Sequence, residues 1–115
     1  MNEFVLLFRM DISPEAQPAP QQMQQYMKDW MAWINDIEAN GNLSGGNHMM
    51  PAGKVVMPGG KVSDGVYTKD KESVAGYITV LAKDMDEALR IAKQCPILHG
   101  DGNSVEVRQT ATPGS

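Results

Sequence analysis

The sequence has little of several features that common functions require. Its single cysteine, Cys95, excludes an internal disulfide and fits a reducing cytoplasm. Ten Lys and Arg face 14 Asp and Glu, for a net charge of −4, and no basic stripe exists that would attract nucleic acid. No apolar run approaches the roughly 18 to 20 residues that a membrane span needs. We therefore expect a cytoplasmic protein that binds neither nucleic acid nor a membrane.

The motifs of several reaction classes are also missing. The two histidines, His48 and His99, have no neighbour at metal-ligand spacing. No nucleophile elbow is present, and the glycine-containing stretch "GGNHMMPAGK" lacks the GK[ST] ending of a phosphate loop. The sequence therefore predicts no metal site, no cofactor and no nucleophilic catalysis.

A length of 115 residues predicts one domain, which we place at residues 1–110, with a frayed tail at 111–115. The N-terminal stretch "MNEFVLLFRMD" is apolar, but it lacks a basic leader and a small-residue cleavage site. It is therefore interpreted as a strand and not as a signal peptide.

The pattern of apolar residues predicts two helices and four strands. The first helix follows Pro20 and ends at Gly41, with an apolar stripe of Met23, Met27, Trp30, Ile34 and Ile37. Asp84 and Glu87 predict a capping box at the start of the second. The strands are expected near residues 3–10, 54–57, 74–82 and 104–110. This order, βαββαβ, is the ferredoxin-like arrangement of an α+β protein with an antiparallel sheet.

The first strand carries apolar residues on both of its faces, since Phe4, Leu6 and Phe8 alternate with Val5 and Leu7. Two helices can cover only one face of a four-stranded sheet, so something else must cover the other. The simplest cover is the sheet of a second copy. We therefore expect a homodimer formed through the open sheet face, with the two sheets facing each other.

His48 is the better of the two histidines as a candidate catalytic residue. It follows Gly45-Gly46 in a loop before the second expected strand, where Asp64 could reach it from the long loop between strands. An imidazole with a carboxylate can perform general acid/base chemistry. The alternative is a surface histidine in a glycine-rich loop. Arg9 and Arg108, near strand ends, are candidate ligand-binding residues.

The stretch "GGKVSDGVYTKDKESVAGY", residues 59–77, is long for a connection between two strands. Asp64-Gly65 predicts a turn, with Asp64 accepting a hydrogen bond from the backbone two residues on. Tyr67 would then pack onto the sheet or a neighbouring chain, or its hydroxyl would reach a ligand. The segment is either an arm that reaches a partner or a lid over a cleft.

The stretches "FVLLFR", "GNLSGG" and "VSDGVYTKDKESVAGYITVLAKDMDEALRIAKQCP", followed by "SVEVR", resemble the YCII-related family in its DGPF-domain branch. The resemblance covers residues 2–108 and implies a dimeric α+β barrel. This sequence departs from the motif that gives the branch its name, because Val66-Tyr67 stand where the branch usually has Pro-Phe. A related branch that includes a dehydrochlorinase uses a histidine in the first helix, and this helix has none. Some members of the DGPF branch are associated with sigma factors.

Two functional hypotheses follow. The first is a protein that binds or transforms a small molecule by lyase- or isomerase-type general acid/base chemistry, in a cleft near His48, Asp64 and Tyr67. The alternative is a non-enzymatic regulatory or interaction module linked to transcription initiation, as the resemblance suggests. The first needs His48 and a carboxylate at a common cavity. The second needs an exposed apolar patch that the dimer does not use.

Overall fold

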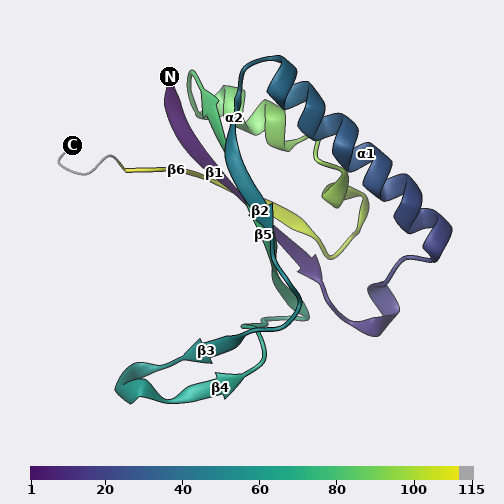
Figure 1. The fold of residues 1–115 in the computed structure, drawn as a ribbon, viewed down its shortest axis with the longest axis vertical. Helices are drawn as coiled ribbons and strands as arrows, with labels where there is room; N and C mark the ends of the chain where they lie inside the picture. The colour runs from purple at the N-terminus through teal and green to yellow at the C-terminus, as the bar shows by residue number, and fades with distance from the viewer. Residues whose placement is uncertain (112–115) are drawn as a thin grey trace.

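The protein, seen in a computed structural model that describes residues 1–111, is an α+β structure of two helices and six strands (Figure 1). The tail expected to fray, residues 111–115, lies outside the described residues except for Ala111. No helix in residues 1–111 is long and apolar enough to cross a membrane. The elements are β1 (Asn2–Asp11), α1 (Pro20–Ala39), β2 (Leu43–His48), β3 (Lys54–Val56), β4 (Val62–Asp64), β5 (Glu72–Ala82), α2 (Met85–Ala92) and β6 (Ser104–Gln109).

Four of the strands form one antiparallel sheet in the order β2-β5-β1-β6. The first and last sheet strands of the chain, β1 and β6, are therefore neighbours, and β5 lies between β1 and β2. This is the ferredoxin-like order, so the fold class expected from the pattern of elements is confirmed.

The second sheet strand lies earlier in the chain than the sequence predicts. It is β2, "LSGGNH", which the glycines and polar residues led us to interpret as a loop. The strand expected near residues 54–57 exists as β3, but β3 pairs with β4 in a separate two-stranded hairpin. The prediction was wrong because β2 is an edge strand that is stabilised by its pairing with β5. Backbone pairing of this kind requires no alternation of apolar residues, so the sequence shows no strand pattern there.

Both helices pack on one face of the sheet. Alternate residues of β1 and β5 point into this face, and they are joined there by both tryptophans of α1 and by two alanines of α2. The buried set is Phe4, Leu6, Phe8, Trp30, Trp33, Ile37, Ile78, Val80, Ala82, Ala88, Ala92, Cys95 and Ile97. The indoles of Trp30 and Trp33 both point inward.

Helix α1 ends as expected at Gly41, whose φ of +75° is in the left-handed region that favours glycine. The amide of Asn42 donates to the carbonyl of Ile37 (3.0 Å), the hydrogen bond of a Schellman cap. The predicted apolar stripe is buried only in the second half of the helix. Met23 and Met27 are exposed because the first half packs beside the short 3-10 segment η3 (Pro96–His99) rather than the sheet.

Helix α2 begins at the predicted cap. The Asp84 carboxylate accepts a hydrogen bond from the amide of Glu87 (3.0 Å). The Glu87 carboxylate accepts from the amide of Lys83 (3.2 Å), one residue before the position that a capping box requires.

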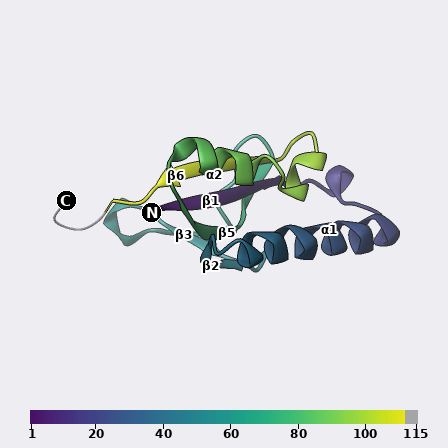
Figure 2. The same cartoon turned by 90° about the horizontal axis from the view of Figure 1, so that it is seen from above.

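The other face of the sheet, which we call the open face, is covered by no helix or strand within residues 1–111. Apolar side chains occupy its centre and are half-buried: Val5, Leu7, Tyr77 and Leu81. Figures 1 and 2 show α1 on one side of the sheet and the β3–β4 hairpin extending from its end toward the other side. The hairpin and its flanks, residues 49–67, are called the arm below.

Candidate functional site

A cleft of about 290 Å³ lies between α1 and the edge strand β2. Gly46 lies on its sheet side, opposite Ile78 in the strand register. We call this hollow the α1–β2 cleft. Its walls are Phe8, Trp30, Met31, Ile34, Leu43, Gly45, Gly46, Asn47, His48, Tyr77 and Ile78.

Close contact between the backbones of β2 and β5 makes glycine necessary at two positions, Gly46 and Gly76. Gly46 has a φ of +135°, and a Cβ there would lie 2.4 Å from the carbonyl oxygen of Tyr77. A Cβ at Gly76 would lie 2.8 Å from the carbonyl oxygen of Asn47. Neither distance is sterically allowed, so both positions fix how closely β2 approaches β5.

His48 stands at the end of β2 and presents its ring to the cleft. It lies opposite Gly76, which in turn lies opposite Phe8, so these side chains share the helix-facing side. The indole of Trp30 covers the gap between them, with its ring centre 4.9 Å from Phe8 and 5.4 Å from His48. His48 is therefore an exposed polar group on the rim of an aromatic wall.

The aromatic wall is held in place by α2. The indole Nε1 of Trp33 donates to the carbonyl oxygen of Ile91 (3.0 Å), and its ring packs edge-on against Trp30 with centres 5.4 Å apart. These contacts fix the rotamers of both tryptophans. A rigid apolar wall of this kind suits a flat apolar ligand.

A second hollow, of about 410 Å³, lies between the first half of α1 and η3. Tyr26 and His99 both line it. Burial, with a smaller contribution from Cys95, raises the pKa of Tyr26 to about 12. Burial also raises the pKa of the Cys95 thiol to about 12, against a small opposing effect of a backbone hydrogen bond. Both groups are therefore neutral at physiological pH.

Arg9 and Arg108 lie on the open face, where they share Glu106. Arg9 donates to the Glu106 carboxylate at 2.5 Å, and Arg108 approaches its other oxygen at 3.6 Å. The three side chains form one partly exposed network across β1 and β6. Glu106 and Arg108 share this face because they lie opposite Leu7 and Val5 in the register.

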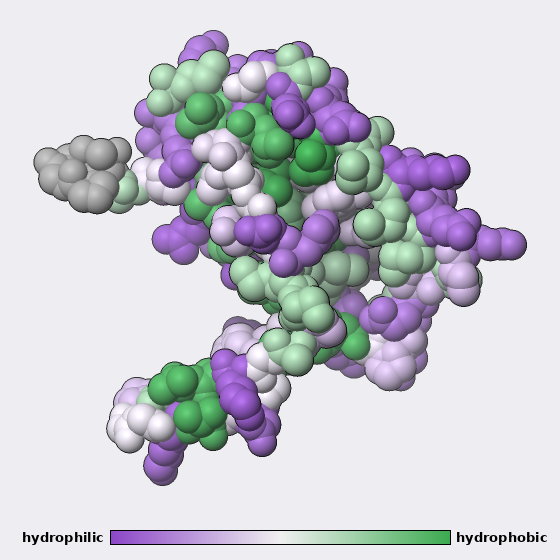
Figure 3. Space-filling model, in the orientation of Figure 1, coloured by the Kyte–Doolittle hydropathy of each residue, from purple (hydrophilic) through white to green (hydrophobic). Residues whose placement is uncertain are grey.

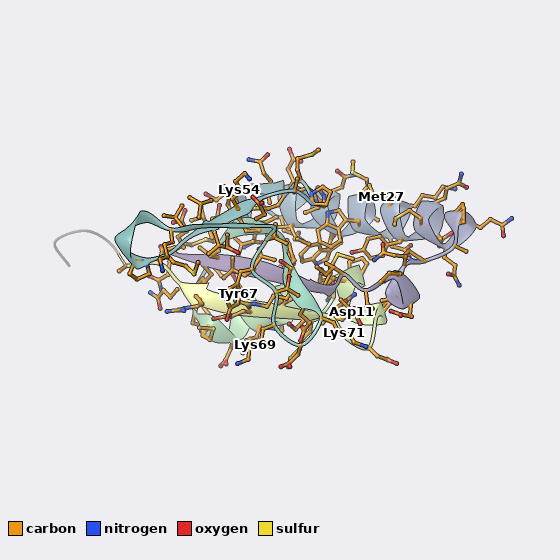
Figure 4. All side chains as sticks on the ribbon, turned by 90° about the horizontal axis from the view of Figure 1, so that it is seen from below. Asp11, Met27, Lys54, Tyr67, Lys69 and Lys71 are labelled. Atoms are coloured by element: carbon orange, nitrogen blue, oxygen red, sulfur yellow. The ribbon has the colours of Figure 1, made fainter. Side chains whose placement is uncertain are left out.

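Asp64 and Tyr67 belong to the arm. The Asp64 carboxylate pairs with the Lys54 ammonium across the β3–β4 hairpin instead of accepting from the backbone two residues on. Gly65 has the predicted positive φ, +90°. Tyr67 is 71% exposed and does not pack on the sheet of its own chain. Figure 4 shows Lys54 and Tyr67 on the arm side of the molecule, away from Met27 on α1.

The structure thus divides the candidate residues between different places. His48 lines the α1–β2 cleft, whereas Arg9 and Tyr67 line a larger hollow of about 710 Å³ between the arm and the sheet. Neither hollow is lined by Asp64 or Arg108. Within residues 1–111, no three His, Cys, Asp or Glu side chains gather into a group that could hold a metal ion.

The sequence pattern missed the close approach of β2 to β5 at Gly46 and Gly76, which lie opposite Ile78 and His48. A glycine pair in the sequence is typical of a loop, and its register against another strand is not visible there.

Comparison with solved structures found an enzyme with a similar fold. The 5-chloro-2-hydroxyhydroquinone dehydrochlorinase TftG from Burkholderia phenoliruptrix AC1100, in complex with 2,5-dihydroxybenzoquinone, matches over 94% of this chain and 93% of its own, with 16% sequence identity and a TM-score of 0.56. This likeness concerns the fold. No curated protein matched the chain in a sequence search. The model of the YCII-related domain matches residues 4–111, nearly the whole chain. The protein therefore belongs to the YCII-related domain family.

Proposed function

We propose that the protein binds a small, flat and mostly apolar molecule in the α1–β2 cleft, with His48 as the polar group that orients it. The observation that carries this proposal is the position of the His48 ring, 5.4 Å from the Trp30 indole, at the rim of an aromatic-walled cleft. A ligand ring would stack on the indole while its polar substituent meets the imidazole.

The size of the cleft limits the ligand. Its volume of about 290 Å³ is at the lower end of the roughly 300–1,000 Å³ typical of small-molecule sites. A single substituted ring is a ligand of a size that suits this space. TftG, whose fold is similar, is described in complex with the single-ring compound 2,5-dihydroxybenzoquinone. That compound is a suitable first probe.

The chemistry that we propose is proton transfer by His48. An imidazole can both accept and donate a proton, so it can serve a lyase- or isomerase-type step on a ring hydroxyl. The carboxylate partner expected from Asp64 is not at this cleft, since Asp64 pairs with Lys54 on the arm. His48 therefore acts with the ligand's own hydroxyl groups instead of with a carboxylate dyad.

A binding experiment tests this proposal. We expect 2,5-dihydroxybenzoquinone or a related hydroquinone to bind, as measured by isothermal titration calorimetry. His48→Ala removes one polar contact and should weaken binding about tenfold. His99→Ala is the matched control, since it removes the other histidine from a different hollow and should leave affinity unchanged. Equal affinity of the His48→Ala variant and the wild type would contradict the role of His48, and no binding of such rings would contradict the cleft.

We also propose that the protein is a cytoplasmic homodimer in which two open faces meet, as in a dimeric α+β barrel, and that it belongs to the DGPF branch. The support is the apolar centre of the open face, where Leu7 lies opposite Tyr77 and Val5 lies opposite Thr79. Burying these side chains against a second copy removes apolar surface from water. The network of Arg9, Glu106 and Arg108 would form a polar border to that contact.

The second candidate function is a non-enzymatic interaction module linked to transcription initiation. It is favoured by the exposed apolar side chains of the arm, among them Val56 and Tyr67, both 71% exposed. This alternative requires that the arm stay free when the dimer forms. The position of the arm in solution therefore distinguishes this second candidate function from ligand binding in the cleft.

A further inference from the structure

The arm, residues 49–67, is an extension that its own chain does not cover. Among the described residues, β3 and β4 pair only with each other. A two-stranded hairpin by itself is marginally stable in water and needs a further surface to pack on. The arm departs at the end of β2 and returns to β5, so two sheet strands hold its base.

The arm exposes an unusual amount of apolar surface. Val56 and Val62 lie directly opposite each other in the hairpin and are 71% and 58% exposed. Met50 at the base is 81% exposed, and Tyr67 on the returning segment is 71% exposed. Figure 3 shows hydrophobic surface on the arm, separated from the main body of the molecule. A cluster of this kind marks a contact with another molecule.

The arm and the open face border one concavity. The hollow of about 710 Å³ is lined by Arg9 and Val74 from the sheet and by Val55 and Tyr67 from the arm. The arm extends on the side of the sheet opposite α1 (Figures 1 and 2). A body that rests on the open face would therefore also meet the arm.

The arm is poorly placed to be a lid over the α1–β2 cleft. That cleft lies on the helix-covered face, because His48 and Phe8 point there. The arm would have to fold back around the edge of the sheet to reach it. A Cβ at Gly53 would come within 2.9 Å of Val66, so the two sides of the arm's base are packed closely together.

A second copy needs more surface than the open face alone provides, and the arm lies next to that face. Strands of 6, 11, 10 and 6 residues, each residue about 3.4 Å long and neighbouring strands about 4.8 Å apart, give a flat area of roughly 540 Å². A stable dimer buries roughly 800 Å² on each partner. The open face alone falls short, and the apolar surface of the arm supplies a region of suitable chemistry next to it.

We propose that the arm of each protomer packs its Val56–Val62 patch against the other protomer, so that the second copy closes the hollow around Arg9 and Tyr67. This inference rests on the proposed homodimer and adds that the contact is reciprocal, as two-fold symmetry requires. The ligand class of that closed hollow would be set by residues of both chains.

Mixed dimers test where the arm lies. One population carries a spin label at Lys61→Cys, next to the patch, and the other carries ¹⁵N without a label. Cys95 is 2% exposed and remains unlabelled. We expect paramagnetic broadening of amide signals in the ¹⁵N chain, which the label can reach only across the dimer. Broadening that appears only when label and ¹⁵N are on the same chain would overturn the proposal.

The mass of the same sample separates the two proposals. A one-chain mass by light scattering would overturn the dimer and the arm contact together. A two-chain mass without broadening between chains would leave the dimer standing and overturn the arm contact alone, in favour of an arm that is free for another partner.

Substitution provides a second measurement. The double variant Val56→Lys, Val62→Lys should raise the dimer dissociation constant at least tenfold, because it places charge in the apolar contact. Leu98→Lys, at a 43% exposed position in η3 of the helical layer, is the matched control and should leave the constant unchanged. Equal dissociation constants for the arm variant and the wild type would refute the proposal. Circular dichroism checks that both variants are folded.

Discussion

At the scale of single residues, glycine shapes the candidate site more than any reactive side chain does. Gly46 and Gly76 let β2 lie close against β5, and this places His48 beside Trp30 at the α1–β2 cleft. His48 itself contributes one polar group at the rim. The chemistry of the site thus depends on the spacing between the backbones of β2 and β5. The presence of a histidine at position 48 does not by itself indicate this spacing.

Gly76→Ala should disturb this spacing. The added Cβ would stand 2.8 Å from the carbonyl oxygen of Asn47, and relieving that contact means displacing β2. We expect the free energy of unfolding to fall by about 1–3 kcal/mol, measured by urea denaturation. Gly45→Ala is the control on the same strand, because its Cβ would meet Thr79 at 3.4 Å, and it should change stability by less than about 0.5 kcal/mol. Equal effects of the two substitutions would contradict this account.

At the scale of elements, helix ends were easier to predict than strand identity. Asp84 and Gly41 mark helix ends in the sequence because caps are local, and both are found where expected. The strand β2 has no such local signal, since Leu43 is its only apolar residue. The strand β2 is held in place by hydrogen bonds to β5, a strand about 30 residues further along the chain.

Asp84→Ala should destabilise α2 by about 1 kcal/mol, because the amide of Glu87 loses the carboxylate that accepts its hydrogen bond. Asp84→Asn retains an accepting oxygen and should lose less than half as much. The measurement is urea denaturation followed by circular dichroism. If alanine were no worse than asparagine, the cap would contribute nothing to stability.

At the scale of the whole molecule, the unpaired surfaces matter most. The helices bury one face of the sheet, and the open face keeps Leu7 and Tyr77 half-buried with no element above them. A monomer would leave these side chains and the arm in contact with water. The proposed dimer removes both from water in one contact.

We expect the wild-type protein to have a two-chain mass by light scattering at micromolar concentration, and Leu7→Lys to shift it toward one chain. A lysine opposite Tyr77 would bury an unpaired charge at the centre of the contact. Leu98→Lys, on the helical layer, should keep the two-chain mass. A wild type that scatters as one chain would end the dimer proposal.

The sequence by itself determined the ferredoxin-like order and the helix ends, because apolar periodicity and caps are local in the chain. Its resemblance to the YCII-related family agrees with the domain that matches residues 4–111. The sequence also indicated that one sheet face lacks a cover, since β1 is apolar on both sides. Only the tertiary structure decided that Asp64 and His48 do not share a cleft, because their distance depends on where the arm leaves the sheet. The tertiary structure likewise decided that "LSGGNH" is a strand, since the register of β2 against β5 comes from contacts between distant parts of the chain.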